Sequence, residues 1–122
     1  MASILIIDDD AQFRAMLRQM LSRAGYEVLE ASNGKEGMRI YRDKPADLVI
    51  TDLIMPEKEG IETISDLRRE FPDVKIVAIS GGGKMGPDDY LHGAKLIGAE
   101  RIFTKPLERE EILEAVKKLI DS

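Results

Sequence analysis

The sequence contains no cysteine, a single histidine and no apolar run that approaches the length of a membrane span. The absence of cysteine excludes disulfide bonds and thiolate metal sites. His92 has no second imidazole to share a metal site, so we take it as an ordinary surface residue. The 18 Lys and Arg residues are outnumbered by 23 Asp and Glu residues, and a net charge of −5 without a basic cluster argues against direct nucleic-acid binding. The residues after Met1 lack the pattern of a signal peptide, so we expect a cytoplasmic protein without membrane contact.

The 122 residues, of which 43% are hydrophobic and 34% charged, suffice for one soluble domain and leave no room for a second. We therefore expect a single domain over residues 1–122, without an output domain. Apolar runs predict five strands, at residues 3–7, 26–31, 48–52, 74–79 and 101–104. Apolar residues at helical spacing predict a helix after each strand, which indicates an α/β protein with helices on both faces of a parallel sheet. Five strands fit the doubly wound, flavodoxin-like order 2-1-3-4-5.

Local signals mark where the predicted helices begin and end. Asp10 is expected at the N-terminus of the first helix, where the helix dipole favours an acid, and Gly25 just past its end. Glu59 and Gly60 are expected to end the loop before the third helix. The spacing of apolar residues predicts the buried faces of the first, third and last helices, respectively Phe13, Met16, Leu17, Met20, Leu21 and Ala24; Ile61, Ile64, Leu67 and Phe71; Ile112, Val116, Leu119 and Ile120.

Carboxylates follow two of the predicted strands. Asp8 and Asp9 end the first strand, and Asp52 ends the apolar run of the third. In the order 2-1-3-4-5 the chain reverses direction of winding between these two strands, and ligands bind outside the carboxyl ends of the strands at that point. Ser80 and Lys105 follow the fourth and fifth strands and reach the same edge. Taken alone, Asp52 could equally begin a turn, since Asp is a common turn residue.

Three carboxylates in one crevice repel one another, and a divalent cation relieves the repulsion. Oxygen ligands without sulfur or clustered imidazole favour Mg²⁺, or Mn²⁺, over zinc. We expect Asp9 and Asp52 to bind the cation directly and Asp8 to act through a bound water. The backbone carbonyl of Ile54, in the loop after Asp52, would complete the protein ligands.

A metal beside a carboxylate suggests phosphoryl transfer to that carboxylate, with Asp52 as the nucleophile. Negative charge in the transition state spreads over three equatorial oxygens, so catalysis consists mainly of positioning and charge stabilisation. The cation would take one oxygen, the Lys105 ammonium a second and the Ser80 hydroxyl a third.

These residues resemble the receiver domain of two-component response regulators, in its single-domain chemotaxis-type form. The resemblance rests on four motifs in the right order and spacing, namely Ile4-Leu5-Ile6-Ile7-Asp8-Asp9-Asp10, Asp52-Leu53-Ile54-Met55-Pro56 with Glu59-Gly60, Ser80-Gly81 and Thr104-Lys105-Pro106. It implies that Asp52 accepts a phosphoryl group from a sensor histidine kinase or a phosphotransfer protein. It also implies that Ser80 is the switch hydroxyl, that Lys105 is the pocket lysine and that the Lys105–Pro106 bond is cis. Such a protein is a signalling module that catalyses only its own phosphorylation and dephosphorylation.

The chain departs from this family at the position of Ile102, where many receivers carry a Tyr or Phe that swings inward on activation. An isoleucine cannot make this movement, so the signal is expected to leave through Ser80 and residues 81–83. Neither Ile54 nor Gly82 can orient a hydrolytic water, which predicts a long-lived phosphoryl group. The resemblance places the output surface on the predicted helix 87–97, the fifth strand and the last helix, with a downstream protein or a second copy as partner.

Two other functions fit part of this pattern. A small aspartate-nucleophile phosphatase of the haloacid dehalogenase type uses an Asp-x-Asp pattern after its first strand, which Asp8-Asp9-Asp10 contains. Met55-Pro56 and Lys105-Pro106 fit a receiver better. A degenerate receiver that only binds partners is disfavoured because the acidic set is intact.

Overall fold

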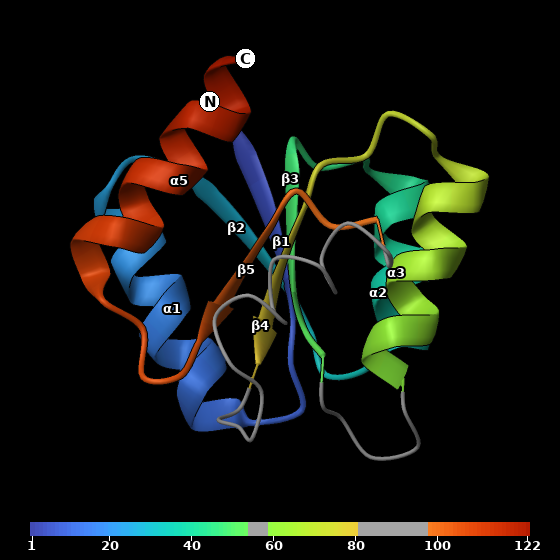
Figure 1. Ribbon diagram of the computed structural model, residues 1–122, viewed down its shortest axis with the longest axis horizontal. Helices are drawn as coiled ribbons and strands as arrows, with labels where there is room; N and C mark the ends of the chain where they lie inside the picture. The colour runs from blue at the N-terminus through green and yellow to red at the C-terminus, as the bar shows by residue number, and fades with distance from the viewer. Residues whose placement is uncertain (54–58, 81–97) are drawn as a thin grey trace.

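The computed structural model describes residues 1–53, 59–80 and 98–122, and its centre is one parallel sheet with the order β2-β1-β3-β4-β5 (Figure 1). The five strands are β1 (Ser3–Ile7), β2 (Glu27–Ala31), β3 (Leu48–Asp52), β4 (Ile76–Ser80) and β5 (Arg101–Thr104). The described helices are α1 (Ala11–Arg23), α2 (Gly34–Asp43), α3 (Glu59–Glu70) and α5 (Arg109–Asp121). The predicted class and strand order are confirmed. The helix expected at residues 87–97 lies outside the described residues.

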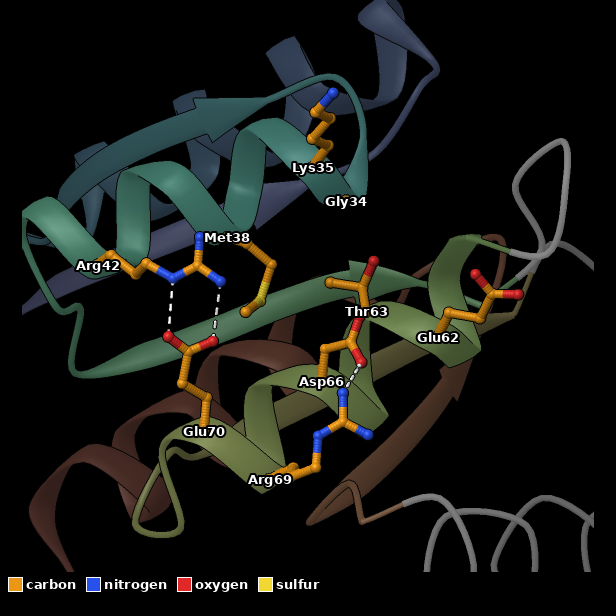
Figure 2. Close-up of a pocket in the computed structure, with 9 residues that line it drawn as sticks. All are labelled: Gly34, Lys35, Met38, Arg42, Glu62, Thr63, Asp66, Arg69 and Glu70. Atoms are coloured by element: carbon orange, nitrogen blue, oxygen red, sulfur yellow. Dashed lines mark hydrogen bonds and ion pairs between the residues drawn. The ribbon is translucent and has the colours of Figure 1, made fainter.

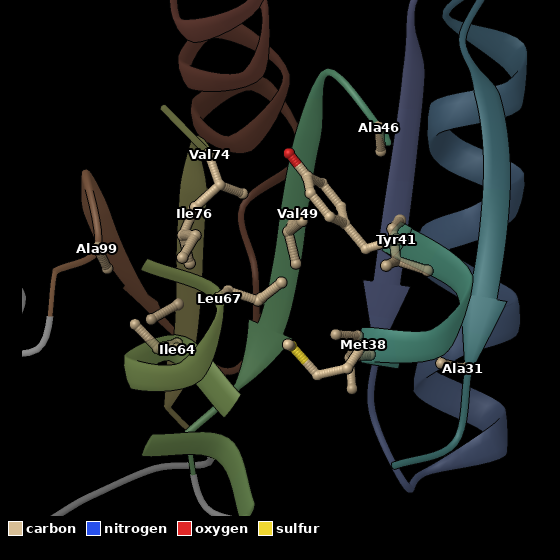
Figure 3. Close-up of a cluster of buried hydrophobic side chains, with 13 residues drawn as sticks. Ala31, Met38, Tyr41, Ala46, Val49, Ile64, Leu67, Val74, Ile76 and Ala99 are labelled. Carbon is tan, nitrogen blue, oxygen red and sulfur yellow. The ribbon is translucent and has the colours of Figure 1, made fainter. Parts of the chain in front are cut away.

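Helices cover both faces of the sheet, with α1 and α5 on one side and α2 and α3 on the other (Figure 1). Alternate side chains of each central strand therefore enter two different hydrophobic clusters. Leu5 and Val49 belong to the cluster under α2 and α3 (Figure 3), whereas Ile4 and Leu48 belong to the cluster under α1 and α5. Because both faces are covered, every residue of β1, β3 and β4 is buried, which explains their unbroken apolar runs.

Strand and helix boundaries differ from the predictions at three places. Tyr26 lies before β2, and its N–H donates to Leu21 O in the turn after α1. Val74 is buried but lies before β4, where its N–H donates to Phe71 O in a turn. In the sequence, apolar residues in turns thus resemble strand residues. Glu59 and Gly60, predicted as the end of a loop, are instead the first two residues of α3.

Three predicted core residues, namely Met16, Ala24 and Ile61, are exposed. Met16 on α1 is 40% exposed, whereas Leu17 and Leu21 of the same helix are fully buried. Ile61 on α3 is 48% exposed, because Thr63 takes the inward position in this part of the helix.

Thr63 is buried where α2 and α3 meet. A Cβ added to Gly34, the first residue of α2, would lie 1.9 Å from Thr63 Oγ1, so the close approach of the two helices requires glycine.

Ala24, predicted on the buried face of α1, is also exposed, and Leu119 and Ile120 of α5 are only partly buried.

Both predicted ends of α1 are confirmed. Asp10 is the N-cap of α1, and its Oδ1 accepts the N–H groups of Gln12 and Phe13 at 3.0 and 3.2 Å. Gly25 follows the C-cap of this helix with φ at +98°, a backbone conformation that favours glycine. Among the described residues, no helix is long and apolar enough to cross a bilayer.

Candidate functional site

The predicted acidic residues meet at the carboxyl ends of β1 and β3. The two strands are neighbours with Ile7 opposite Thr51, so the next residue of each chain segment, Asp8 and Asp52, falls at the same edge. Each of Asp8, Asp9 and Asp52 offers a carboxylate oxygen within 4.8 Å of the others. The juxtaposition expected from the strand order is therefore confirmed.

Asp8 is 1% exposed and is held by its neighbours on three sides. Its N–H donates to Ala31 O at 3.1 Å, its carbonyl accepts Arg14 Nη1 at 2.7 Å, and its Oδ1 accepts the Asp10 N–H at 2.8 Å. Its other oxygen, Oδ2, is buried without a hydrogen-bond partner among the described residues. Burial raises the pKa of Asp8, and the charge of Asp52 raises it further, while the Asp10 N–H and Lys105 oppose the rise.

Lys105 supplies the positive charge of this site. Its Nζ lies 3.4 Å from Asp8 Oδ2 and 3.5 Å from Asp52 Oδ2. The first of these contacts is an ion pair without hydrogen-bond alignment, since Asp8 Oδ2 has no hydrogen-bond partner. The peptide bond from Lys105 to Pro106 is cis, as the resemblance implied.

Ser80 ends β4 at the same edge of the sheet and is 3% exposed. Its carbonyl accepts the N–H of Lys105 at 2.9 Å, so the ends of β4 and β5 are joined directly beside the acids. Asp52 is 4% exposed, and its carbonyl accepts Thr51 Oγ1 at 3.3 Å. Ser80 and Lys105 thus lie at the edge predicted for them.

Two predicted features of the site fall outside the described residues, namely the carbonyl of Ile54 and the loop 81–83. Ile102 is described, and its half-buried side chain packs against the cluster under α2 and α3. Phe103 packs on the opposite side of the sheet, against the cluster under α1 and α5. The neighbouring aromatic ring therefore does not occupy the space that Ile102 fills.

Sequence reasoning missed Arg14, which supports the acidic site from α1. Besides its bond to the carbonyl of Asp8, its Nε lies 3.3 Å from Glu30 Oε1 on β2. Glu30 Oε2 also pairs with Arg18 at 3.3 Å. No local sequence pattern signals this arrangement, because it depends on the pairing of β1 with β2.

The donor set fits a small divalent cation. Its three side chains supply oxygen ligands only. One buried oxygen, Asp8 Oδ2, has no hydrogen bond among the described residues, so a cation or its bound water could bind there. Within the part of the chain that the structure describes, Lys105 is the one ammonium paired with these carboxylates, which leaves net negative charge among them.

A separate cleft of about 400 Å³ lies between α2 and α3 (Figure 2). Arg42 Nε and Nη2 reach the two carboxylate oxygens of Glu70 across this cleft at 2.8 and 2.9 Å, and Arg69 pairs with Asp66 on α3. None of the acidic site residues lines it. Its charges neutralise one another and tie the two helices together.

A doubly wound sheet with three acids and a lysine at the point where its winding reverses defines a phosphoacceptor domain. Residues 4–117 match the family described as response regulator receiver domain, and the chain belongs to this family. It is a phosphorylatable receiver of two-component signalling, and the comparisons lend no support to the phosphatase alternative.

Known relatives agree with this assignment. The chain is 36% identical over 117 residues to a chemotaxis protein CheY of Thermotoga maritima, with 95% of each chain covered. It is 33% identical over 119 residues to the chemotaxis protein CheY of Bacillus subtilis, with 97% of each covered. Among solved structures, the response regulator TrrA of Thermotoga maritima in complex with Mg²⁺-BeF superimposes with a TM-score of 0.85 at 31% identity, covering 98% of this chain and 99% of that one.

Proposed function

We propose that Asp52 is the residue that accepts the phosphoryl group. The observation that carries this proposal is the arrangement around its carboxylate, which is buried, lies 3.5 Å from Lys105 Nζ and shares an oxygen cluster with Asp8 and Asp9. In the transfer, an Asp52 oxygen forms the new bond to phosphorus. The bond from phosphorus to a histidine nitrogen of the donor breaks, and that nitrogen keeps the electron pair.

Mg²⁺, or Mn²⁺, is the proposed cofactor, with Asp9 and Asp52 as direct ligands and Asp8 bound through water. The complex of TrrA with Mg²⁺-BeF supports this assignment by similarity. The cation supplies charge neutralisation at the transferred oxygens. Asp8 is held at the cation side of the site, because its carboxylate accepts the Asp10 N–H and its backbone carbonyl accepts Arg14 Nη1.

Lys105 and Ser80 stabilise the remaining negative charge. The Lys105 ammonium lies near two carboxylates, and from this position it would donate to a phosphoryl oxygen on Asp52. The Ser80 hydroxyl, at the adjacent strand end, would donate to another oxygen.

The phosphodonor is a sensor histidine kinase or a phosphotransfer protein. The output is a change of protein contacts, to a downstream protein or a second copy, on the face that includes β5 and α5. Ile102 cannot transmit the signal by rotation of a ring, so we assign transmission to Ser80 and residues 81–83. No other reaction is proposed for this domain beyond its own phosphorylation and dephosphorylation.

Incubation with Mg²⁺ and acetyl phosphate, followed by intact mass measurement, tests the proposal. We expect one added phosphoryl group in the wild type and none in Asp52→Asn. Asp66→Asn, which removes a surface carboxylate paired with Arg69 on α3, is the matched control and should be phosphorylated like the wild type. An adduct that persists in Asp52→Asn would overturn the assignment. Turnover of a phosphate monoester that requires Asp8 would instead support the phosphatase.

A further inference from the structure

Lys105 has an aromatic neighbour in addition to the two carboxylates. Its Nζ lies 4.1 Å from the centroid of the Phe13 ring, in the first turn of α1. This distance is well inside the roughly 6 Å within which the face of a ring attracts a cation. Phe13 is only half-buried and packs against the hydrophobic cluster under α1 and α5. Its ring therefore forms part of the core and part of the wall beside the ammonium.

The acidic loop itself fixes the position of this ring. Asp10 donates its N–H to Asp8 Oδ1 at 2.8 Å, and its own Oδ1 accepts the N–H of Phe13 at 3.2 Å. The backbone of Phe13 is thereby attached, through one residue, to the carboxylate that lies 3.4 Å from Lys105 Nζ. Asp10 therefore bonds both to the Asp8 carboxylate and to the backbone of the residue that carries the ring.

The carboxylates alone hold the ammonium loosely. The distances of 3.4 and 3.5 Å exceed the roughly 2.7–2.9 Å of a short charge-assisted hydrogen bond. A lysine side chain has several rotatable bonds and would otherwise sample many positions at the edge of the sheet. A bound cation would also compete for the two carboxylates, whereas it would leave the face of the ring available to Nζ.

We infer that Phe13 is a positioning residue for the phosphoryl transfer. It holds the Lys105 ammonium at the acidic site by attraction to its ring, so that Nζ remains directed at the phosphoryl oxygens once the cation has taken the carboxylates. The inference rests on the proposed function of Asp52, and it assigns to this aromatic residue a role that an aliphatic core residue of similar size could not perform.

Replacement of the ring separates this role from simple packing. Phe13→Leu fills the core without a π face, and Phe13→Tyr retains the face. With acetyl phosphate and saturating Mg²⁺, we expect Phe13→Leu to slow phosphorylation roughly 3- to 10-fold, in line with the strength of such contacts, and Phe13→Tyr to remain near the wild-type rate. Phe71→Leu removes a ring that packs edge-on against Tyr41 in the other cluster and should leave the rate unchanged.

A second measurement reports the contact without any phosphorylation. The ring should shift the NMR signals of the Lys105 ε-methylene protons upfield in the wild type and in Phe13→Tyr, and this shift should vanish in Phe13→Leu. In a Lys105→Met background, Phe13→Leu should cause no further loss of rate. An unphosphorylated wild type would refute the function proposed for Asp52. If the wild type is phosphorylated and Phe13→Leu reacts at the same rate, the role of Phe13 is overturned. The same holds if the Lys105 signals of Phe13→Leu equal those of the wild type.

Discussion

The two edges of the sheet use charged side chains in opposite ways. At the amino-terminal edge, charges satisfy backbone groups. Asp47 accepts the N–H of Ser3 at 2.8 Å, which ties the starts of β1 and β3. Lys75, just before β4, donates to the carbonyls of Leu119 and Ser122 at the end of α5.

At the carboxyl-terminal edge, charges of the same sign are brought together. Asp8, Asp9 and Asp52 lie within one cluster, with Lys105 as their positive neighbour and with Asp8 Oδ2 lacking a hydrogen bond. Such an arrangement opposes folding unless a cation binds. One edge therefore contributes to the stability of the fold, whereas the other gathers like charges whose repulsion a bound cation would relieve.

Replacing one lysine at each edge by methionine should give the largest difference in phosphorylation rate. Lys105→Met should slow phosphorylation by acetyl phosphate roughly 10²-fold, because a donor to the transition state is lost. Lys75→Met at the opposite edge should leave this rate unchanged and lower the melting temperature, because the carbonyls at the end of α5 lose their donor. Equal rates in the two variants would remove the functional distinction between the edges.

A carboxylate of the amino-terminal edge should affect stability alone. Glu100 accepts the N–H of Ile76 and pairs with Arg68 at 2.8 Å. Glu100→Ala should lower the free energy of unfolding by about 2 kcal/mol in urea titrations, since the N–H of Ile76 loses its acceptor. The gain in melting temperature on adding Mg²⁺ should equal that of the wild type. Loss of that gain would mean that the two edges are coupled.

Asp8→Asn should stabilise the metal-free protein, in contrast to Lys75→Met and Glu100→Ala. Its expected effect is the smallest of these. Removing a buried charge while keeping an acceptor for the Asp10 N–H should raise the free energy of unfolding of the metal-free protein by roughly 1 kcal/mol. The variant should gain little or no stability from Mg²⁺, whereas the wild type gains. Glu114→Gln, a surface carboxylate on α5 paired with Lys118, is the matched control and should change neither quantity appreciably.

The sign of the pH dependence follows from the raised pKa of Asp8. The folded protein binds this proton more tightly than the unfolded chain, so the group stabilises the fold at low pH and loses that contribution as pH rises through its folded-state pKa. Without metal, the advantage of Asp8→Asn over the wild type should therefore be largest at neutral pH and disappear below the ordinary carboxyl range. Urea titrations across this pH range in EDTA check the trend, and an advantage that grows in acid would contradict it.

Much of the fold follows from local patterns. The apolar runs of β1, β3 and β4 indicated strands buried on both faces, and their number together with the helices between them led to the observed strand order. The turns before β2 and β4 were assigned wrongly because Tyr26 and Val74 are apolar for reasons of packing, which a pattern of single residues does not distinguish from strand pairing.

The sequence by itself determined which acids meet beside one another, because acids directly after apolar runs fall at one edge of any parallel sheet. Tertiary structure alone decided the energetics of that edge. Three features of that edge depend on how separate segments pack: the burial of Asp8 Oδ2, the bond from Arg14 to the Asp8 carbonyl, and the Phe13 ring beside Lys105. Burial and direction of side chains depend on how these segments pack, and local sequence does not specify either.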